Sequence, residues 1–82
     1  MDSNVFKNQS LQEKLEMIFN NGSELYYRSH LYYTIRLYSL GDFFVEVWYL
    51  PYSKKIDKVE IISLEDVLHL YRHQFDISEL LS

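Results

Sequence analysis

Apolar residues near the start of the chain recur with a helical period, which predicts an amphipathic helix from about residue 10. They stand at Leu11, Leu15, Ile18 and Phe19, at spacings of three and four. Ser10 and Glu13 form the S-x-x-E capping box that starts a helix. Asn20, Asn21 and Gly22 follow, and residues of these types end a helix at low steric cost.

From Glu24 the apolar period changes to two, which predicts β-strands. The alternating run over residues 24–38 is long for one strand, so we expect either one bent strand or two strands broken near Ser29 and His30. Further strands are predicted at residues 43–50 and 58–63. The segment PYSKKID between them is predicted to be an exposed connection because it combines proline with turn-prone and charged residues.

The loop around Gly41 decides how the strands pair. A two-residue loop at Gly41 and Asp42 sets Leu37 beside Glu46 and so mixes charge into both faces, whereas a three-residue loop at residues 39–41 pairs odd with odd positions. Gly41 then takes the third loop position, where a positive φ is needed. We therefore predict the three-residue loop, with Leu37 beside Phe43, Ile35 beside Val45 and Tyr33 beside Val47.

A second helix is predicted after Ser63, which serves as its cap, with Glu65 and Asp66 in the first turn. Its apolar stripe comprises Leu64, Val67, Leu68, Tyr71 and Phe75. The spacing of Asp76 and Glu79 around apolar residues predicts a short terminal turn that folds back on the core.

The predicted fold class is α+β, in one small domain that spans residues 1–82. The expected order is a helix, an antiparallel meander of three or four strands and a second helix, which is αβββα or αββββα. We expect both helices to pack on one face of the sheet, the face of the odd-numbered strand positions.

Composition narrows the function classes. The chain carries a net charge of -4 and no cysteine, so disulfides and thiolate sites are excluded and a reducing, cytoplasmic setting is expected. No apolar run is long enough to span a membrane, and the first ten residues lack the pattern of a secretory signal. We therefore expect no membrane partner, and nothing in the composition indicates a cofactor or small-molecule ligand.

One weak metal site is suggested by Asp66, His69 and His73, which fall on one side of the second helix and are residue types that bind zinc. The same side is the polar face of an amphipathic helix, where charged residues are expected in any case. We therefore predict a solvated face there and no metal.

A nucleic-acid-binding sheet is a second alternative. Cations alternate with aromatic residues on the even-numbered strand positions, at Arg28, His30, Arg36 and Lys58. Glutamates share these positions and the net charge is acidic, both of which argue against it. We expect the cations to pair locally instead, Arg36 with Glu46 and Lys58 with Trp48 or Glu46.

Catalysis has less support. His30 is the one candidate general base, and it stands on a predicted strand without a nucleophile or a glycine-rich loop around it. We predict a non-enzymatic protein.

The leading hypothesis is a protein-interaction module, most simply a homodimer, whose aromatic sheet face binds a second copy or another protein. The predicted interface residues are Tyr32, Tyr38, Phe44, Trp48, Leu50 and Ile62. The open alternative is internal cover of this face, by residues 76–82 or by Val5 and Phe6.

Overall fold

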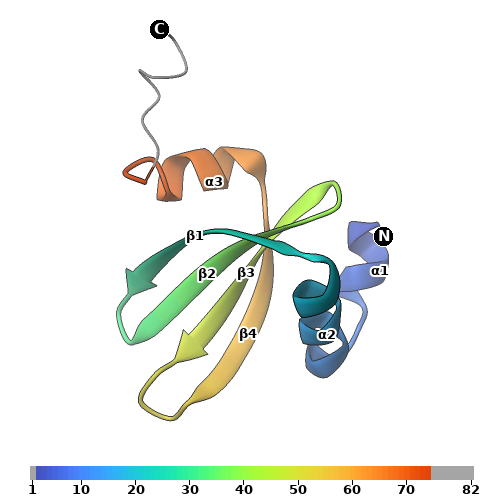
Figure 1. Cartoon of the computed structure of the whole chain (residues 1–82), viewed down its shortest axis with the longest axis horizontal. Helices are drawn as coiled ribbons and strands as arrows, with labels where there is room; N and C mark the ends of the chain where they lie inside the picture. The colour runs from blue at the N-terminus through green and yellow to red at the C-terminus, as the bar shows by residue number, and fades with distance from the viewer. Residues whose placement is uncertain (1, 75–82) are drawn as a thin grey trace, which may run out of the picture.

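The computed structural model describes residues 2–74, and these residues form three helices and four strands (Figure 1). The elements are α1 Ser3–Lys7, α2 Leu11–Asn21, β1 Ser23–His30, β2 Tyr33–Leu40, β3 Phe43–Leu50, β4 Lys55–Ile62 and α3 Leu64–Leu70. The strands form one antiparallel sheet in the order β1-β2-β3-β4. The predicted α+β class is confirmed, with four strands in the meander. The predicted terminal turn and Phe75 lie outside the described residues.

The start of α2 is set by local hydrogen bonds. The Ser10 hydroxyl accepts a bond from the Glu13 amide at 3.2 Å, and the Glu13 carboxylate accepts one from the Ser10 amide at 3.1 Å. This reciprocal pair is the predicted capping box, and it lowers the pKa of Glu13. Gly22 ends the helix, where an added Cβ would lie 2.6 Å from the carbonyl oxygen of Ile18.

The long alternating run is two strands. β1 ends at His30, Leu31 and Tyr32 form the turn, and β2 begins at Tyr33. The break therefore falls just after the predicted position. Leu31 has a φ of 53°, the left-handed region that residues with a Cβ rarely adopt.

The predicted three-residue loop between β2 and β3 is wrong. The loop has two residues, Gly41 and Asp42, so Leu40 pairs with Phe43 and Leu37 pairs with Glu46. Gly41 has a φ of 62° at the first turn position, as in the tight hairpin turn that favours glycine there. Gly41 satisfies either loop length, so the turn alone does not choose the register.

The observed register redistributes the side chains between the two faces. Odd positions of β2 now lie beside even positions of β3, because the paired residues sum to an odd number. The buried clusters follow this division. One contains Phe6, Ile18, Leu40, Val45 and Val47. The other contains Leu37, Val67 and Tyr71, with Tyr26, Phe44 and Ile62 packed against it.

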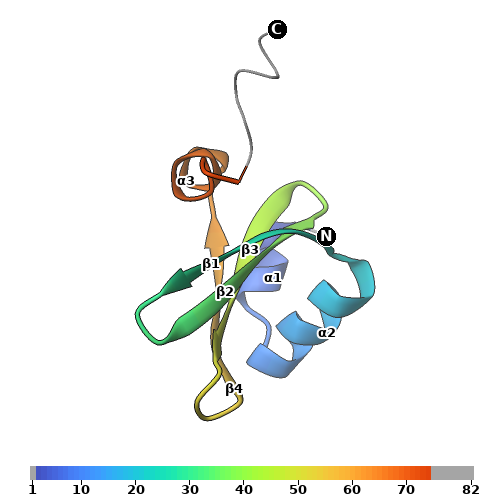
Figure 2. The same ribbon diagram turned by 60° about the vertical axis from the view of Figure 1, so that its left-hand side comes forward.

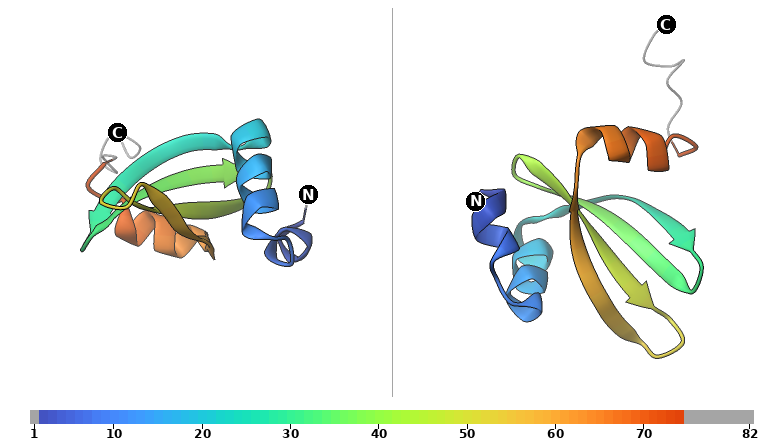
Figure 3. Two further views of the ribbon diagram at one scale, coloured as in Figure 1. Left: turned by 90° about the horizontal axis from the view of Figure 1, so that it is seen from below. Right: turned by 180° about the vertical axis from the view of Figure 1, so that it is seen from behind.

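The two clusters lie on opposite faces, because Leu37 and Tyr38 are neighbours in β2 and Tyr38 packs with the first cluster. We call the face of Val45 and Tyr38 the α2 face and the face of Leu37 and Glu46 the α3 face. The expected single helical layer is thus divided: α1 and α2 pack on the first face and α3 on the second. Figures 2 and 3 show α3 lying apart from α1 and α2.

Helix α3 begins at the predicted cap, where the Ser63 hydroxyl accepts a bond from the Asp66 amide at 3.1 Å. It is shorter than the apolar stripe suggested. Val67 and Tyr71 are buried, but Leu64 and Leu68 are 57% and 47% exposed. The helix is therefore held to the sheet mainly by two side chains.

Candidate functional site

The structure does not bring the six predicted interface residues together on one surface. Phe44 and Ile62 pack beside α3, and Trp48 lies farther along the same face. Tyr38 is on the opposite face, under α2. Tyr32 projects from the β1–β2 turn with 81% of its surface exposed, and Leu50 is half-buried at the end of β3. The two-residue hairpin separates these residues, because it places even positions of β2 and β3 on different faces.

The α3 face contains a buried carboxylate, Glu46, which is 2% exposed. Arg28 binds it with two hydrogen bonds, from Nε at 3.0 Å and from a terminal nitrogen at 3.3 Å, and the Tyr71 hydroxyl donates a third at 2.6 Å. Burial opposes the charge of Arg28, but Glu46 outweighs this effect and raises the pKa of Arg28. The cluster joins β1, β3 and α3, so we assign it a structural role.

Trp48 lies beside this cluster and is surrounded by cations. Arg28 stands over its ring at 5.4 Å and Lys58 at 4.2 Å, so the predicted pair of Lys58 with Trp48 is confirmed. Tyr33 packs edge-on against the same ring at 4.9 Å. The indole nitrogen is buried, with no hydrogen-bond partner among the described residues.

The predicted cation pairs are otherwise corrected. Glu46 binds Arg28 rather than Arg36, and Arg36 instead pairs with Glu24 at 2.6 Å. Lys58 also pairs with Glu60 at 3.5 Å. Three of the four cations of the alternative nucleic-acid patch are thus held in ion pairs, and Arg28 is largely enclosed.

The other candidate residues are scattered. Asp66, His69 and His73 are exposed, and no group of three metal-ligating side chains converges within residues 2–74. His30 is exposed at the end of β1, where its ring lies edge-on to Trp48 at 6.1 Å. The three hollows described next are lined by residues other than these histidines.

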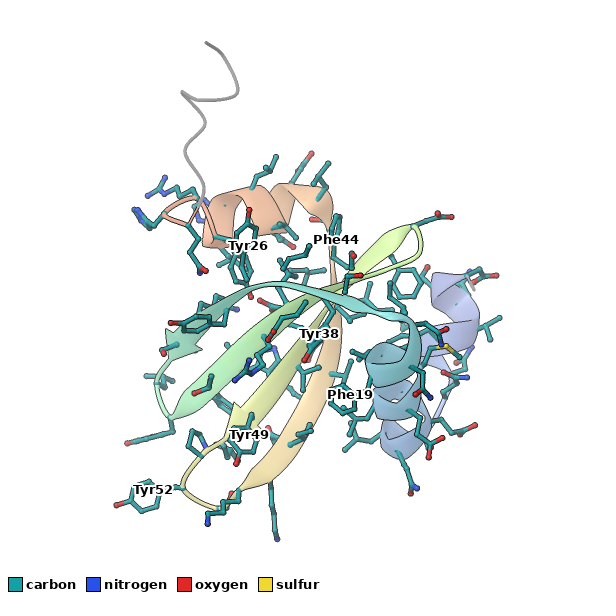
Figure 4. The ribbon with its side chains drawn as sticks, in the orientation of Figure 1. Phe19, Tyr26, Tyr38, Phe44, Tyr49 and Tyr52 are labelled. Atoms are coloured by element: carbon teal, nitrogen blue, oxygen red, sulfur yellow. The ribbon has the colours of Figure 1, made fainter. Side chains whose placement is uncertain are left out.

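The α2 face contains a shallow groove of about 360 Å³ between α2 and the part of the sheet that α2 does not cover. It is lined by Phe19, Glu24, Arg36, Tyr38, Val47, Tyr49 and Ile56. Phe19 projects from α2 toward Tyr38, with the rings edge-on at 6.2 Å (Figure 4). Figure 4 shows Tyr49 farther along the sheet, where no helix lies over it. We call this surface the aromatic groove.

One ion pair joins β1 to β2 beside the aromatic rings of the groove. Arg36 and Glu24 are about half exposed, and their hydrogen bond raises the pKa of Arg36. Burial raises the pKa of the neighbouring Tyr38, and the Glu24 charge adds to this effect, so the phenol stays neutral. The groove therefore offers aromatic surface together with one positive and one negative group.

Two other hollows are less suited to binding a protein partner than the aromatic groove. One, of about 610 Å³, lies between the N-terminal helices and β4, and Lys7, Lys14 and Glu60 contribute to its lining. The other, of about 350 Å³, is lined by Met17, Asn21, Leu40 and Gly41. Neither contains an exposed aromatic ring, so the aromatic groove is the better candidate for binding.

Sequence reasoning missed most of this groove. It assigned Phe19, Tyr49 and Val47 to the core, because each falls on an apolar stripe. Phe19 is nevertheless 59% exposed, since Ile18 occupies the position that α2 buries against the sheet. The signal that was present is the pair of adjacent apolar residues at positions 18 and 19, of which one helix face can bury only one fully.

Comparison of the chain with protein-family models, with curated protein sequences and with solved structures found no match. Within the described residues, no helix is both long enough and apolar enough to cross a membrane.

Proposed function

We propose that this protein is a small, non-enzymatic interaction module that binds a second copy of itself through the aromatic groove. One observation carries the proposal: Phe19, an exposed aromatic residue of α2, and Tyr49, a strand residue that no helix covers, line the same groove as the ion pair between Arg36 and Glu24. Aromatic residues and arginine are the types that dominate the energetics of protein interfaces. The absence of cysteine is consistent with a cytoplasmic location, which forms part of the same proposal.

A two-fold dimer requires a surface that is complementary to itself. The groove meets this requirement, because it contains one cation and one anion side by side. In such a dimer Arg36 of one copy faces Glu24 of the other, and the aromatic floors of the two grooves meet. Both charged residues are about half exposed, so each has surface left for a partner.

The first test is the oligomeric state of the whole chain, measured by light scattering and sedimentation from low to high micromolar concentration. We expect a dimer whose dissociation constant rises about tenfold or more in Phe19→Ala. Leu64→Ala is the matched control, because Leu64 lies on α3 and is 57% exposed, against 59% for Phe19. A wild-type chain that remains monomeric throughout, or equal effects of the two variants, would overturn the proposal.

The charged pair allows a second test that depends on contacts between copies. Arg36→Glu leaves two negative groups in each groove, and Glu24→Arg leaves two positive groups. We expect neither variant to self-associate at concentrations where the wild type does, and an equimolar mixture to form heterodimers. If the mixture remains monomeric although both variants are folded, the ion pair acts within one chain only.

A further inference from the structure

Two loops project from the same end of the sheet. Because the strands form a meander, the β1–β2 turn and the β3–β4 loop lie at one end and the Gly41 turn at the other. Figure 1 shows both loops at the lower left, away from all three helices. We call residues 31–32 and 51–55 together the loop end.

The loop end exposes large apolar side chains. Leu31 and Tyr32 are each 81% exposed, and Tyr52 is completely exposed at the tip of its loop (Figure 4). A single exposed apolar residue is common on protein surfaces, but three at the tips of adjacent loops form an apolar protrusion. Such a protrusion suits insertion into a soft surface better than it suits contact with a rigid concave partner.

The backbone at the tip adds a second indication. Leu31 holds a φ of 53°, a conformation that glycine adopts freely and that is strained for leucine. Leucine here is therefore unfavourable for folding in two respects, its exposure and its backbone conformation. An outlier of this kind motivates a search for function at the same position.

The positive charge of the loop end favours contact with an anionic surface. Lys54 and Lys55 are exposed there, and residues 31–32 and 51–55 include no acidic residue, although the whole chain carries a net charge of -4. Lysine is depleted at protein interfaces, whereas lysine beside exposed tyrosine and leucine is typical of segments that bind anionic membranes.

We infer that the loop end docks on an anionic lipid surface, with Leu31, Tyr32 and Tyr52 entering the headgroup region and Lys54 and Lys55 contacting lipid phosphates. The sequence analysis expected no membrane partner because no apolar run is long enough to span a bilayer. Docking at the surface needs no such run. The inference does not depend on the aromatic groove, because no residue of the loop end lines that groove.

The experiment is cosedimentation of the whole chain with vesicles of phosphatidylcholine alone or mixed with phosphatidylglycerol. We expect binding to the mixed vesicles only, weakened by salt. Lys54→Glu with Lys55→Glu should lower the partition coefficient about tenfold or more. Lys7→Glu with Lys14→Glu is the control, because it changes the net charge equally at a distant site and should have a much smaller effect.

Leu31→Gly separates docking from folding. Glycine relieves the backbone strain, so this variant should unfold at the same temperature as the wild type or a higher one, yet bind mixed vesicles less. Three results would overturn the inference: no wild-type binding to mixed vesicles, equal losses in the two lysine pairs, or unchanged binding by a folded Leu31→Gly variant. A variant that loses vesicle binding and still dimerises would show that this inference and the proposed function are independent of each other.

Discussion

The hydroxyl group of Tyr71 donates a 2.6 Å hydrogen bond to Oε2 of Glu46 and so ties the end of α3 to the centre of the sheet. Both residues are almost completely buried, and Arg28 binds the same carboxylate from β1. A buried carboxylate is tolerated only when its oxygens have hydrogen-bond donors. These three residues therefore act as one unit in the stability of the fold.

Replacement of Tyr71 by phenylalanine should destabilise the protein while preserving its fold. The ring still fills its site, but Glu46 loses one donor, and we expect the free energy of unfolding to fall by about 1–3 kcal/mol. Urea denaturation followed by circular dichroism measures this change. Tyr52→Phe is the control, because Tyr52 is fully exposed and its hydroxyl lies at a loop tip. Equal stability of Tyr71→Phe and the wild type would contradict the assigned role.

The two arginine pairs of the sheet should differ strongly in energy. Arg28→Ala leaves a buried carboxylate without its cation and should cost about 3–5 kcal/mol. Arg36→Ala breaks an exposed pair and should cost about 0–1 kcal/mol. The same denaturation experiment on both variants tests the comparison. Similar losses would mean that Glu46 is not buried in solution as the structure shows.

Stability should decrease in alkali. Burial raises the pKa of Tyr71 first, and its bond to Glu46 raises it further, whereas the phenol titrates near pH 10 in the unfolded chain. The folded state therefore retains a proton that the unfolded state has lost, so the free energy of unfolding falls as the pH rises above about 10. Tyr33 and Tyr38, whose pKa values are also raised, act in the same direction.

Tyr71→Phe provides the check on this pH effect. Denaturation midpoints measured between about pH 9 and pH 11 should fall less steeply in this variant than in the wild type, and Tyr33 and Tyr38 contribute to the slope that remains. Parallel curves for the two proteins would show that Tyr71 does not titrate differently in the folded and unfolded states.

The outer edge of β1 should become more accessible in Gln74→Ala. The side-chain amide of Gln74 donates to the Tyr27 carbonyl and accepts from the Tyr27 amide, so it occupies backbone groups that would otherwise be open to another strand. Amide hydrogen exchange should become faster at Tyr27 and stay unchanged at Ile35, which is buried in β2. No change at Tyr27 would indicate that the Gln74 contact is not populated.

Local signals in the chain predicted the starts of α2 and α3 and an antiparallel meander of three or four strands, but they did not predict α1. The Ser10 capping box and the Ser63 cap depend on bonds to residues three positions away, so adjacent sequence contains all the necessary information. Gly41 likewise marks the second hairpin, although its loop has two residues rather than the predicted three. By contrast, the prediction did not bring the residues of the proposed groove together, because α2 and all four strands contribute to it.

The sequence by itself determined the fold class and the order of α2, the antiparallel meander and α3, because capping, period and turn residues act over a few positions. Only the tertiary structure decided the strand register. Gly41 fits either loop length, and the pairing of Glu46 with Leu37 is unfavourable unless the buried carboxylate has hydrogen-bond donors. Arg28 and Tyr71, 18 and 25 positions away, supply these hydrogen bonds. Since a shift of one residue in register exchanges the two faces of a strand, this one cluster also accounts for the division of helices between the faces and for the exposed aromatic groove.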